Sequence, residues 1–227
     1  TTSTIFITGT GTDIGKTFIT AGLIRTLRSA GRPVGGLKPV ATGFDSAALA
    51  DSDTGILLAA LGRPSTLAEI ERMSPFRFAA PLAPDMAAKR ENRSLDFDAL
   101  VDFCRRAIAS TNGTLLIEGV GGVMVPLDER HTVLDWMAAL DLQLLVVAGS
   151  YLGSISHTLT CLDVVARRGL AIKALVINET PASTVPMSDT MATLAQFAPD
   201  IAIVPLPRLS GAATGDGAFE KIATLLG

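Results

Sequence analysis

The chain has 227 residues, of which 48% are hydrophobic and 18% are charged, and its formal net charge is −3. This length and apolar content allow a large α/β domain with a filled core and argue against a disordered chain. A slightly acidic chain without a dense lysine and arginine run argues against a nucleic-acid binder, and no apolar run reaches the roughly 18 residues of a membrane span.

Short β-like runs alternate with helical segments along the chain. The expected elements, in order, are strand 4–8, helix 16–29, strand 34–38, helix 52–61, helix 97–110, strand 114–118, helix 132–140, strand 143–148, helix 154–168, strand 172–177, helix 188–197 and strand 201–204. Several strands are apolar without alternation, which is typical of a parallel sheet with helices on both faces. The pattern predicts an α/β fold, a single doubly wound domain over residues 1–227 with a mostly parallel sheet flanked by helices. The proline-rich stretch 74–84 is the main irregular segment, and such a loop in a compact domain is often functional.

The remaining rare residues point to packing rather than to chemistry. Cys104 and Cys161 are far apart in helix-like stretches, which favours buried thiols and a cytoplasmic protein over a disulfide or a metal site. Trp136 and Met137 are expected in the core. His157 is expected to be a structural helix residue, because no acid is placed to orient it as a catalyst.

The segment GTGTDIGKT, residues 9–17, directly follows the first strand. Its last residues, Gly15-Lys16-Thr17, match the end of the phosphate-binding pattern G-x-x-x-x-G-K-[ST], although Gly9 stands one position too early for the leading glycine. Backbone N–H groups and the following helix N-terminus would hold phosphate oxygens, while Lys16 would reach the β- and γ-phosphates and Thr17 would ligate Mg²⁺. The alternative is a glycine-rich turn with an incidental lysine. The strand before it and the amphipathic helix after it favour a fold of the P-loop NTPase type.

Three further charged residues stand at ends of expected elements. Glu118 closes an apolar strand and is followed by a glycine-rich turn, and ligands in open α/β sheets bind at such strand ends. Asp53 opens a helix, so it is either a second Mg²⁺ ligand or an N-cap. Lys38 closes the second strand, where it either neutralises charge on a transferring phosphoryl group or is a surface lysine before a turn.

The motifs GTGTDIGKT, LKPVATG, DSD, PFRFAAPLAPDMAA, LLIEGVGGVMVPL, LGSISHT and VIN follow in this order and together resemble the dethiobiotin synthetase family. The resemblance extends from residue 4 to about residue 209, and KPVATG and EGVGG are its most specific parts. It implies an enzyme that uses ATP as co-substrate and Mg²⁺ to convert 7,8-diaminopelargonate and CO₂ into dethiobiotin, ADP and phosphate. The implied route passes through an N-carbamate and a carbamic–phosphoric anhydride. It also implies a homodimer with the active site at the subunit interface, without a nucleic-acid or membrane partner.

The resemblance also assigns roles by motif. It makes Lys38 and Lys16 catalytic, and it surrounds Mg²⁺ with Thr17, Asp53 and Glu118. It assigns contacts with the diamine substrate to Asp13, Thr42 and the turn Leu152, Gly153 and Ser154, the turn coming from the partner subunit. It assigns the nucleotide to Asp13, Ile14, Gly15, Lys16, Thr17, Phe18, Asp53, Glu118, Gly119, Val120, Gly121, Asn178, Glu179, Pro207, Arg208 and Leu209. Among these, Asn178 matches the asparagine that reads adenine.

Other nucleotide-binding classes remain as alternatives. A partitioning or septum-site ATPase of the deviant-Walker class would act as a binding switch, but its signature lysine stands five positions before the loop lysine, where this chain has Gly11. The synthetase half of a glutamine-dependent enzyme needs a glutaminase domain with a cysteine nucleophile, and neither cysteine lies in a glycine-rich nucleophile elbow. A simple GTPase is a weaker alternative, because the sequence has no Asn-Lys-x-Asp guanine motif.

Overall fold

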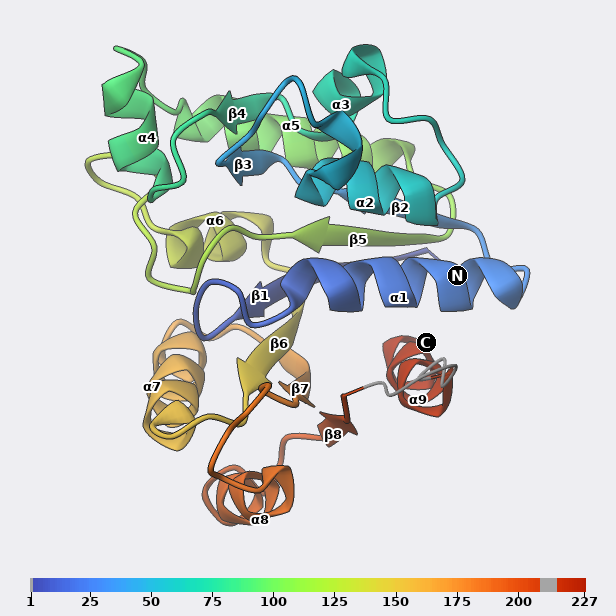
Figure 1. The fold of residues 1–227 in the computed structure, drawn as a ribbon, viewed down its shortest axis with the longest axis vertical. Helices are drawn as coiled ribbons and strands as arrows, with labels where there is room; N and C mark the ends of the chain where they lie inside the picture. The colour runs from blue at the N-terminus through green and yellow to red at the C-terminus, as the bar shows by residue number, and fades with distance from the viewer. Residues whose placement is uncertain (1, 209–215) are drawn as a thin grey trace.

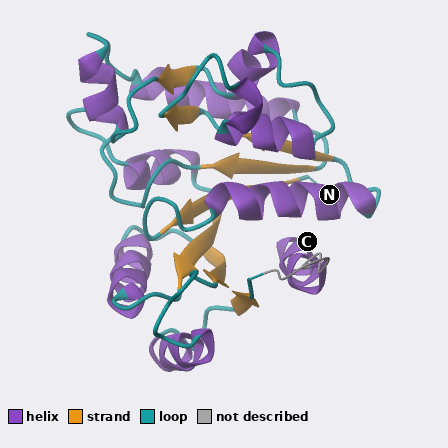
Figure 2. Ribbon diagram, viewed as in Figure 1, coloured by secondary structure: helices purple, strands orange, loops and turns teal. Residues whose placement is uncertain are grey.

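The computed structural model describes residues 2–208 and 216–227, and its centre is a parallel β-sheet. Within these residues six strands pair in the spatial order β2-β5-β1-β6-β7-β8. Their bounds are β1 (Ser3–Gly9), β2 (Val34–Leu37), β5 (Thr114–Glu118), β6 (Gln143–Gly149), β7 (Ile172–Asn178) and β8 (Ile203–Leu206). Neighbouring strands pair in parallel, and helices lie in front of and behind the sheet (Figures 1 and 2), so the predicted doubly wound α/β architecture is confirmed.

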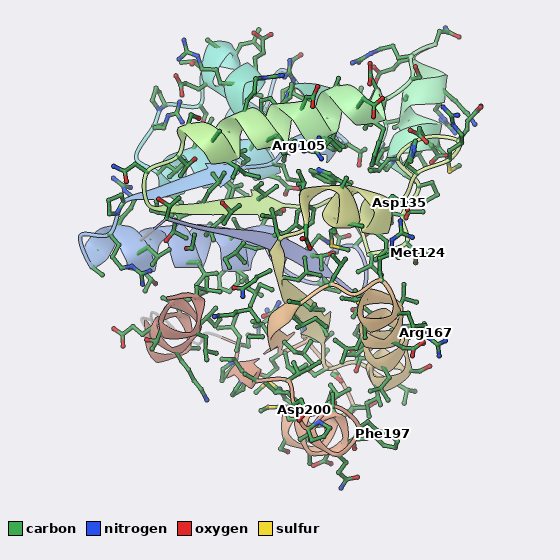
Figure 3. All side chains as sticks on the ribbon, turned by 180° about the vertical axis from the view of Figure 1, so that it is seen from behind. Arg105, Met124, Asp135, Arg167, Phe197 and Asp200 are labelled. Atoms are coloured by element: carbon green, nitrogen blue, oxygen red, sulfur yellow. The ribbon has the colours of Figure 1, made fainter. Side chains whose placement is uncertain are left out.

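Helices cover both faces of the sheet and form two separate cores. One core contains residues of α1 (Lys16–Ser29), α2 (Asp53–Ala60), α3 (Leu67–Met73) and α9 (Asp216–Leu226). The other contains residues of α4 (Pro84–Arg90), α5 (Phe97–Ser110), α6 (Val133–Leu140), α7 (Ser154–Arg167) and α8 (Met187–Phe197). Figure 3 shows the second face from behind, with Arg105 on α5, Asp135 on α6 and Arg167 on α7.

The alternation of side chains along β1 explains why the sheet needs both layers. Ile5 and Ile7 belong to the core beneath α1, whereas Phe6 between them belongs to the core of the opposite face. There the Phe6 ring meets the Trp136 ring edge-on, with centroids 4.8 Å apart. Trp136 and Met137 are fully buried, which confirms their predicted place in the core.

The segment between β2 and α5 departs most from the sequence prediction. Residues of the stretch 74–84, expected to be irregular, form β4 (Phe76–Phe78), which pairs in parallel with β3 (Val40–Thr42) in a separate two-stranded sheet. The same segment contains the 3₁₀ turn η1 (Leu49–Asp51), and α4 begins at a proline, which suits the first turn of a helix. Strands of three residues leave no periodic signal, so their pairing rather than local preference creates them.

Two smaller predictions fare differently. The strand expected at 201–204 begins two residues later, at Ile203, and continues to Leu206. Cys104 and Cys161 are free and buried as predicted, and burial raises the pKa of each thiol to about 12. Among the helices that the structure describes, none combines the length and the apolar run needed to cross a membrane.

Strand register brings the polar residues of several strand ends together. Leu37 of β2 pairs with Ile117 of β5, so the next residues along these strands, Lys38 and Glu118, stand side by side. Glu118 in turn pairs with Ile7 of β1, two residues before that strand ends at Gly9. The carboxyl ends of these strands therefore form one edge, where ligands of such sheets usually bind.

Candidate active site

The phosphate loop connects β1 to α1 and bends sharply before the helix. Gly15 is the N-cap residue of α1 and has φ of 95°, a left-handed conformation that glycine adopts without steric cost. Asp13 has φ of 56°, which is uncommon outside glycine. The Nζ of Lys16 donates a hydrogen bond to the carbonyl oxygen of Gly11 at 2.7 Å, so this side chain folds back over its own loop.

A charge cluster built around the buried pair Lys38 and Glu118 lies beside the loop. Lys38 Nζ donates to Glu118 Oε1 at 2.7 Å and to the Gly119 carbonyl at 2.9 Å, and it lies 3.3 Å from Asp53 Oδ2. The Thr17 hydroxyl donates to the same Glu118 oxygen at 2.7 Å. Glu118 is 0% exposed and Lys38 is 3% exposed. The alternative of Lys38 as a surface lysine is therefore wrong.

The two lysines differ in their electrostatic surroundings. Burial, together with the nearby positive charge of Lys38, lowers the pKa of Lys16 to about 8. Burial also opposes the charged form of Lys38, but the adjacent Glu118 and Asp53 carboxylates more than offset it and raise the pKa of that lysine above its ordinary value. The contrast follows from the contacts, because Lys38 meets carboxylates directly whereas the nearest partner of Lys16 is a neutral carbonyl.

The structure separates the two interpretations of Asp53. The N-cap of α2 is Ser52, whose Oγ accepts a hydrogen bond from the backbone N–H of Gly55 at 3.0 Å. Asp53 is the first residue of the helix, and its carboxylate faces Lys38 across 3.3 Å. Capping therefore does not account for Asp53, which instead belongs to the charge cluster.

The oxygen atoms around this cluster fit a magnesium ion. Asp53 and Glu118 both contact Lys38 Nζ, and the Thr17 hydroxyl donates to Glu118 Oε1. The second Glu118 oxygen, Oε2, is buried without a hydrogen-bond partner among the described residues. Residues 2–208 and 216–227 contain no group of three or more histidine, cysteine, aspartate or glutamate side chains that could hold a metal. Mg²⁺ commonly uses one or two carboxylates and completes its shell with water and phosphate oxygens, so two carboxylates and a hydroxyl suffice.

A cavity of about 770 Å³ opens in front of the loop and the charge cluster. Its volume lies within the usual range for small-molecule sites. The predicted site residues in its wall are Asp13, Gly15, Lys16, Thr17, Lys38, Thr42, Asp53, Glu118, Val120 and Gly121. The structure thus brings together most of the residues predicted for phosphate and metal, and two of the five predicted substrate contacts, Asp13 and Thr42.

The sequence prediction missed one wall of this cavity. It is formed by Phe44, Asp51, Val125 and the segment 81–84, with Thr12 completing the loop side. The irregular composition of 74–84 was a signal that this segment has a function, but it did not show which cavity the segment lines. The answer depends on the β3–β4 pairing, which carries residues 79–84 back to the phosphate loop side.

The predicted carboxylate turn lies outside this cavity. Leu152 is 82% exposed, and Gly153 is the N-cap of α7 with φ of 95°. Ser154 is almost fully buried, and its Oγ has no hydrogen-bond partner among the described residues. None of these three residues lines the cavity within one chain.

The residues predicted to contact the nucleotide base gather around the end of β7. Asn178 Nδ2 donates to the Ile14 carbonyl of the phosphate loop at 3.0 Å, and Glu179 Oε2 accepts from the Arg208 backbone N–H at 2.7 Å. Pro207 and Arg208 are exposed, and Leu209 lies outside the described residues. Phe18 is 40% exposed and meets the Phe219 ring of α9 edge-on, with centroids 5.8 Å apart.

Comparisons with known proteins find a matching family model and similar chains. A family model described as an AAA domain matches residues 3–212. The ATP-dependent dethiobiotin synthetase of Acidiphilium cryptum is 49% identical over 193 residues, 85% of this chain and 86% of that protein. The corresponding protein of Phenylobacterium zucineum is 43% identical over 97% of this chain and 95% of its own length.

Solved structures extend the similarity to more distant proteins. The septum site-determining protein MinD of Pyrococcus horikoshii, complexed with Mg-ADP, gives a TM-score of 0.57 at 17% identity and covers 98% of this chain and 95% of its own. Cobyrinic acid a,c-diamide synthase of Mycobacterium smegmatis, with bound ADP and magnesium, gives 0.55 at 15% identity and covers 99% and 93%. At such identities the likeness shows the fold alone, which confirms the predicted P-loop NTPase type.

Proposed function

Because the chain belongs to the ATP-dependent dethiobiotin synthetase family, we propose that it closes the ureido ring of dethiobiotin from 7,8-diaminopelargonate, CO₂ and MgATP. The observation that carries the proposal is the cluster of Lys38, Glu118, Thr17 and Asp53 beside the phosphate loop, in which Lys38 and Glu118 are buried. Positioning and charge stabilisation dominate phosphoryl transfer, and this cluster supplies both.

The reaction we propose has three steps. One amine of the substrate attacks CO₂ and loses a proton, which gives an N-carbamate. A carbamate oxygen then attacks the γ-phosphorus of ATP, and the bond from that phosphorus to the bridging oxygen breaks, which leaves ADP and a carbamic–phosphoric anhydride. The second amine attacks the carbonyl carbon, a proton is lost, phosphate leaves and the ring closes.

The residues of the chain are assigned to these steps by position. Backbone N–H groups of the loop and Lys16 hold the β- and γ-phosphates, and Lys38 neutralises charge on the transferring group. Thr17, Asp53 and Glu118 would hold Mg²⁺, which supplies positive charge against the phosphate oxygens when bound. Asp13 and Thr42, both in the cavity wall, would contact the diamine end of the substrate.

The far end of the substrate needs a second copy of the chain in this proposal. We propose that the carboxylate binds at the N-terminus of α7 of the partner, because a helix N-terminus favours an anion. The exposure of Leu152, the left-handed Gly153 and the buried hydroxyl of Ser154, which has no hydrogen-bond partner in the described part of the chain, support this assignment. A homodimer in sedimentation measurements is expected, and a protein that stays monomeric at assay concentration while making dethiobiotin would contradict it.

The function is tested by measuring ADP release with and without 7,8-diaminopelargonate and bicarbonate, while mass spectrometry follows dethiobiotin. We expect ADP release to depend on both additions and to match dethiobiotin in amount. ATP hydrolysis that ignores the diamine would contradict the proposal. If hydrolysis instead required DNA, a membrane or a protein partner, the switch-ATPase alternative would be revived.

A further inference from the structure

Asn178 makes a contact that reading the base does not require. It is the last residue of β7, and its Nδ2 donates to the carbonyl oxygen of Ile14, 164 positions away in the chain, at 3.0 Å. Ile14 immediately precedes Gly15, the left-handed residue that turns the phosphate loop into α1. A Cβ atom at Gly15 would lie 2.3 Å from the same Nδ2, so the Asn178 amide packs directly against this bend.

We propose that Asn178 is a positioning residue that ties the end of the phosphate loop to the end of β7. A carbonyl oxygen can only accept a hydrogen bond, so the bond to Ile14 fixes which end of the amide faces the loop. Nδ2 is committed to the loop, and Oδ1 remains available as an acceptor. One side chain thereby holds the loop and presents an acceptor of the kind that the 6-amino group of adenine requires.

Other contacts show why this tie matters. The beginning of the loop is held by the Thr10 backbone N–H, which donates to the Val147 carbonyl at 3.0 Å. The middle is held by Lys16, which donates to the Gly11 carbonyl. This inference rests on the proposed function at one point: when Lys16 turns to the phosphates, the tie at Gly11 is lost, and within residues 2–208 and 216–227 Asn178 remains as the side chain that hydrogen-bonds to a backbone carbonyl of the loop. Asp13, with φ of 56°, is the residue whose uncommon conformation the tie at Ile14 helps to maintain.

The test uses magnesium tripolyphosphate, a ligand with phosphates but without a base. Its direct binding to the purified protein is measured by titration calorimetry for the wild type and for Asn178→Ala. Loss of one ordinary hydrogen bond that orders the loop should weaken tripolyphosphate about fivefold. A residue that only reads the base would leave tripolyphosphate binding unchanged and weaken ATP alone, and that outcome would overturn the proposal.

Two additions make the result specific. Thr180→Val is a matched control, because it removes a hydroxyl that accepts from Ser150 N–H just beyond the same strand end and, among the described hydrogen bonds, makes none to the phosphate loop. Hydrogen exchange of peptides covering residues 9–18 should be faster in Asn178→Ala and close to wild type in Thr180→Val; equal exchange in both variants would refute the tie. If Asn178→Ala does not fold, Asn178→Leu, which keeps roughly the size of the side chain and loses the donor without adding a charge, is measured in the same way. Tripolyphosphate binding needs no turnover, so failure of the proposed reaction and failure of this inference are distinguishable.

Discussion

Replacement of Lys38 by glutamine tests the centre of the site. The lysine is 3% exposed and contacts a fully buried glutamate at 2.7 Å, so its removal leaves Glu118 without its cation. Breaking a buried pair costs about 3–5 kcal/mol of unfolding free energy, and we expect about 3 because the glutamine amide still donates to Glu118. Small domains have about 5–15 kcal/mol, so the variant should remain folded.

We expect Lys38→Gln to lose activity even though the variant stays folded. Removal of one preorganised group that stabilises transition-state charge typically lowers kcat about 10²- to 10³-fold. Turnover is measured as dethiobiotin formation at saturating MgATP, and stability as urea unfolding without nucleotide or metal. Lys89→Gln is the control, because Lys89 pairs with Glu129 at the surface at 3.5 Å and should change unfolding by less than about 0.5 kcal/mol.

The double variant Lys38→Gln, Glu118→Gln decides whether the stability loss comes from the uncompensated charge. Removing both charges should recover at least about 1 kcal/mol relative to the sum of the single variants. A coupling near zero would show that Lys38 and Glu118 do not act as an ion pair. Near-normal turnover in Lys38→Gln would remove the lysine from the mechanism, whatever the stability result.

Two further variants test capping and packing contacts of the helices. Asp135 accepts from the Thr132 backbone and hydroxyl and pairs with Arg168; burial opposes its ionised form, but these partners lower its pKa. The stabilisation is therefore complete above the unfolded pKa of about 4 and is lost as pH falls through the lowered folded pKa. Asp135→Asn should therefore cost about 1 kcal/mol at pH 7 and less at pH 3 in urea titrations. An equal cost at both pH values would contradict this. Gly22→Ala should destabilise the protein by about 1–3 kcal/mol in thermal unfolding, although alanine is the better helix former, because its Cβ would lie 2.2 Å from the Phe219 ring. Phe219→Ala removes that ring, so the double variant should lose less stability than the sum of the two single variants. Strict additivity of the two losses would refute the clash.

Much of the site could be predicted from the sequence because its charged residues stand at the ends of strands. Lys38 and Glu118 are charged residues directly after apolar runs, and Gly15-Lys16-Thr17 follows another such run. Parallel strands align their carboxyl ends, so strand-end residues meet once the strand order is known. The order itself, with β5 between β2 and β1, is not readable from local patterns, because it is set by which apolar faces pack together.

The remaining parts depend on contacts that leave no local signal. The cavity wall at Phe44 and 81–84 exists because two three-residue strands pair across more than 30 positions. The capping of α2 was ambiguous because Ser52 and Asp53 are both good capping residues, and only geometry selects the serine. The contact between Asn178 and Ile14 joins a strand end to a loop, and no sequence pattern specifies such a pair.

The charge balance of the site explains how the same residues can act with and without bound nucleotide. A carboxylate as buried as Glu118 requires a cation nearby at all times, and Lys38 provides it here at 2.7 Å. A bound triphosphate would draw both lysines towards its oxygens, which would leave Glu118 and Asp53 in need of a new positive partner. Glu118 Oε2, which has no hydrogen-bond partner among the residues that the structure describes, and the neighbouring Thr17 hydroxyl oxygen are the ligand atoms such a partner would use. Nucleotide is therefore expected to bind together with a metal, because nucleotide alone would draw Lys38 away and leave the buried Glu118 uncompensated.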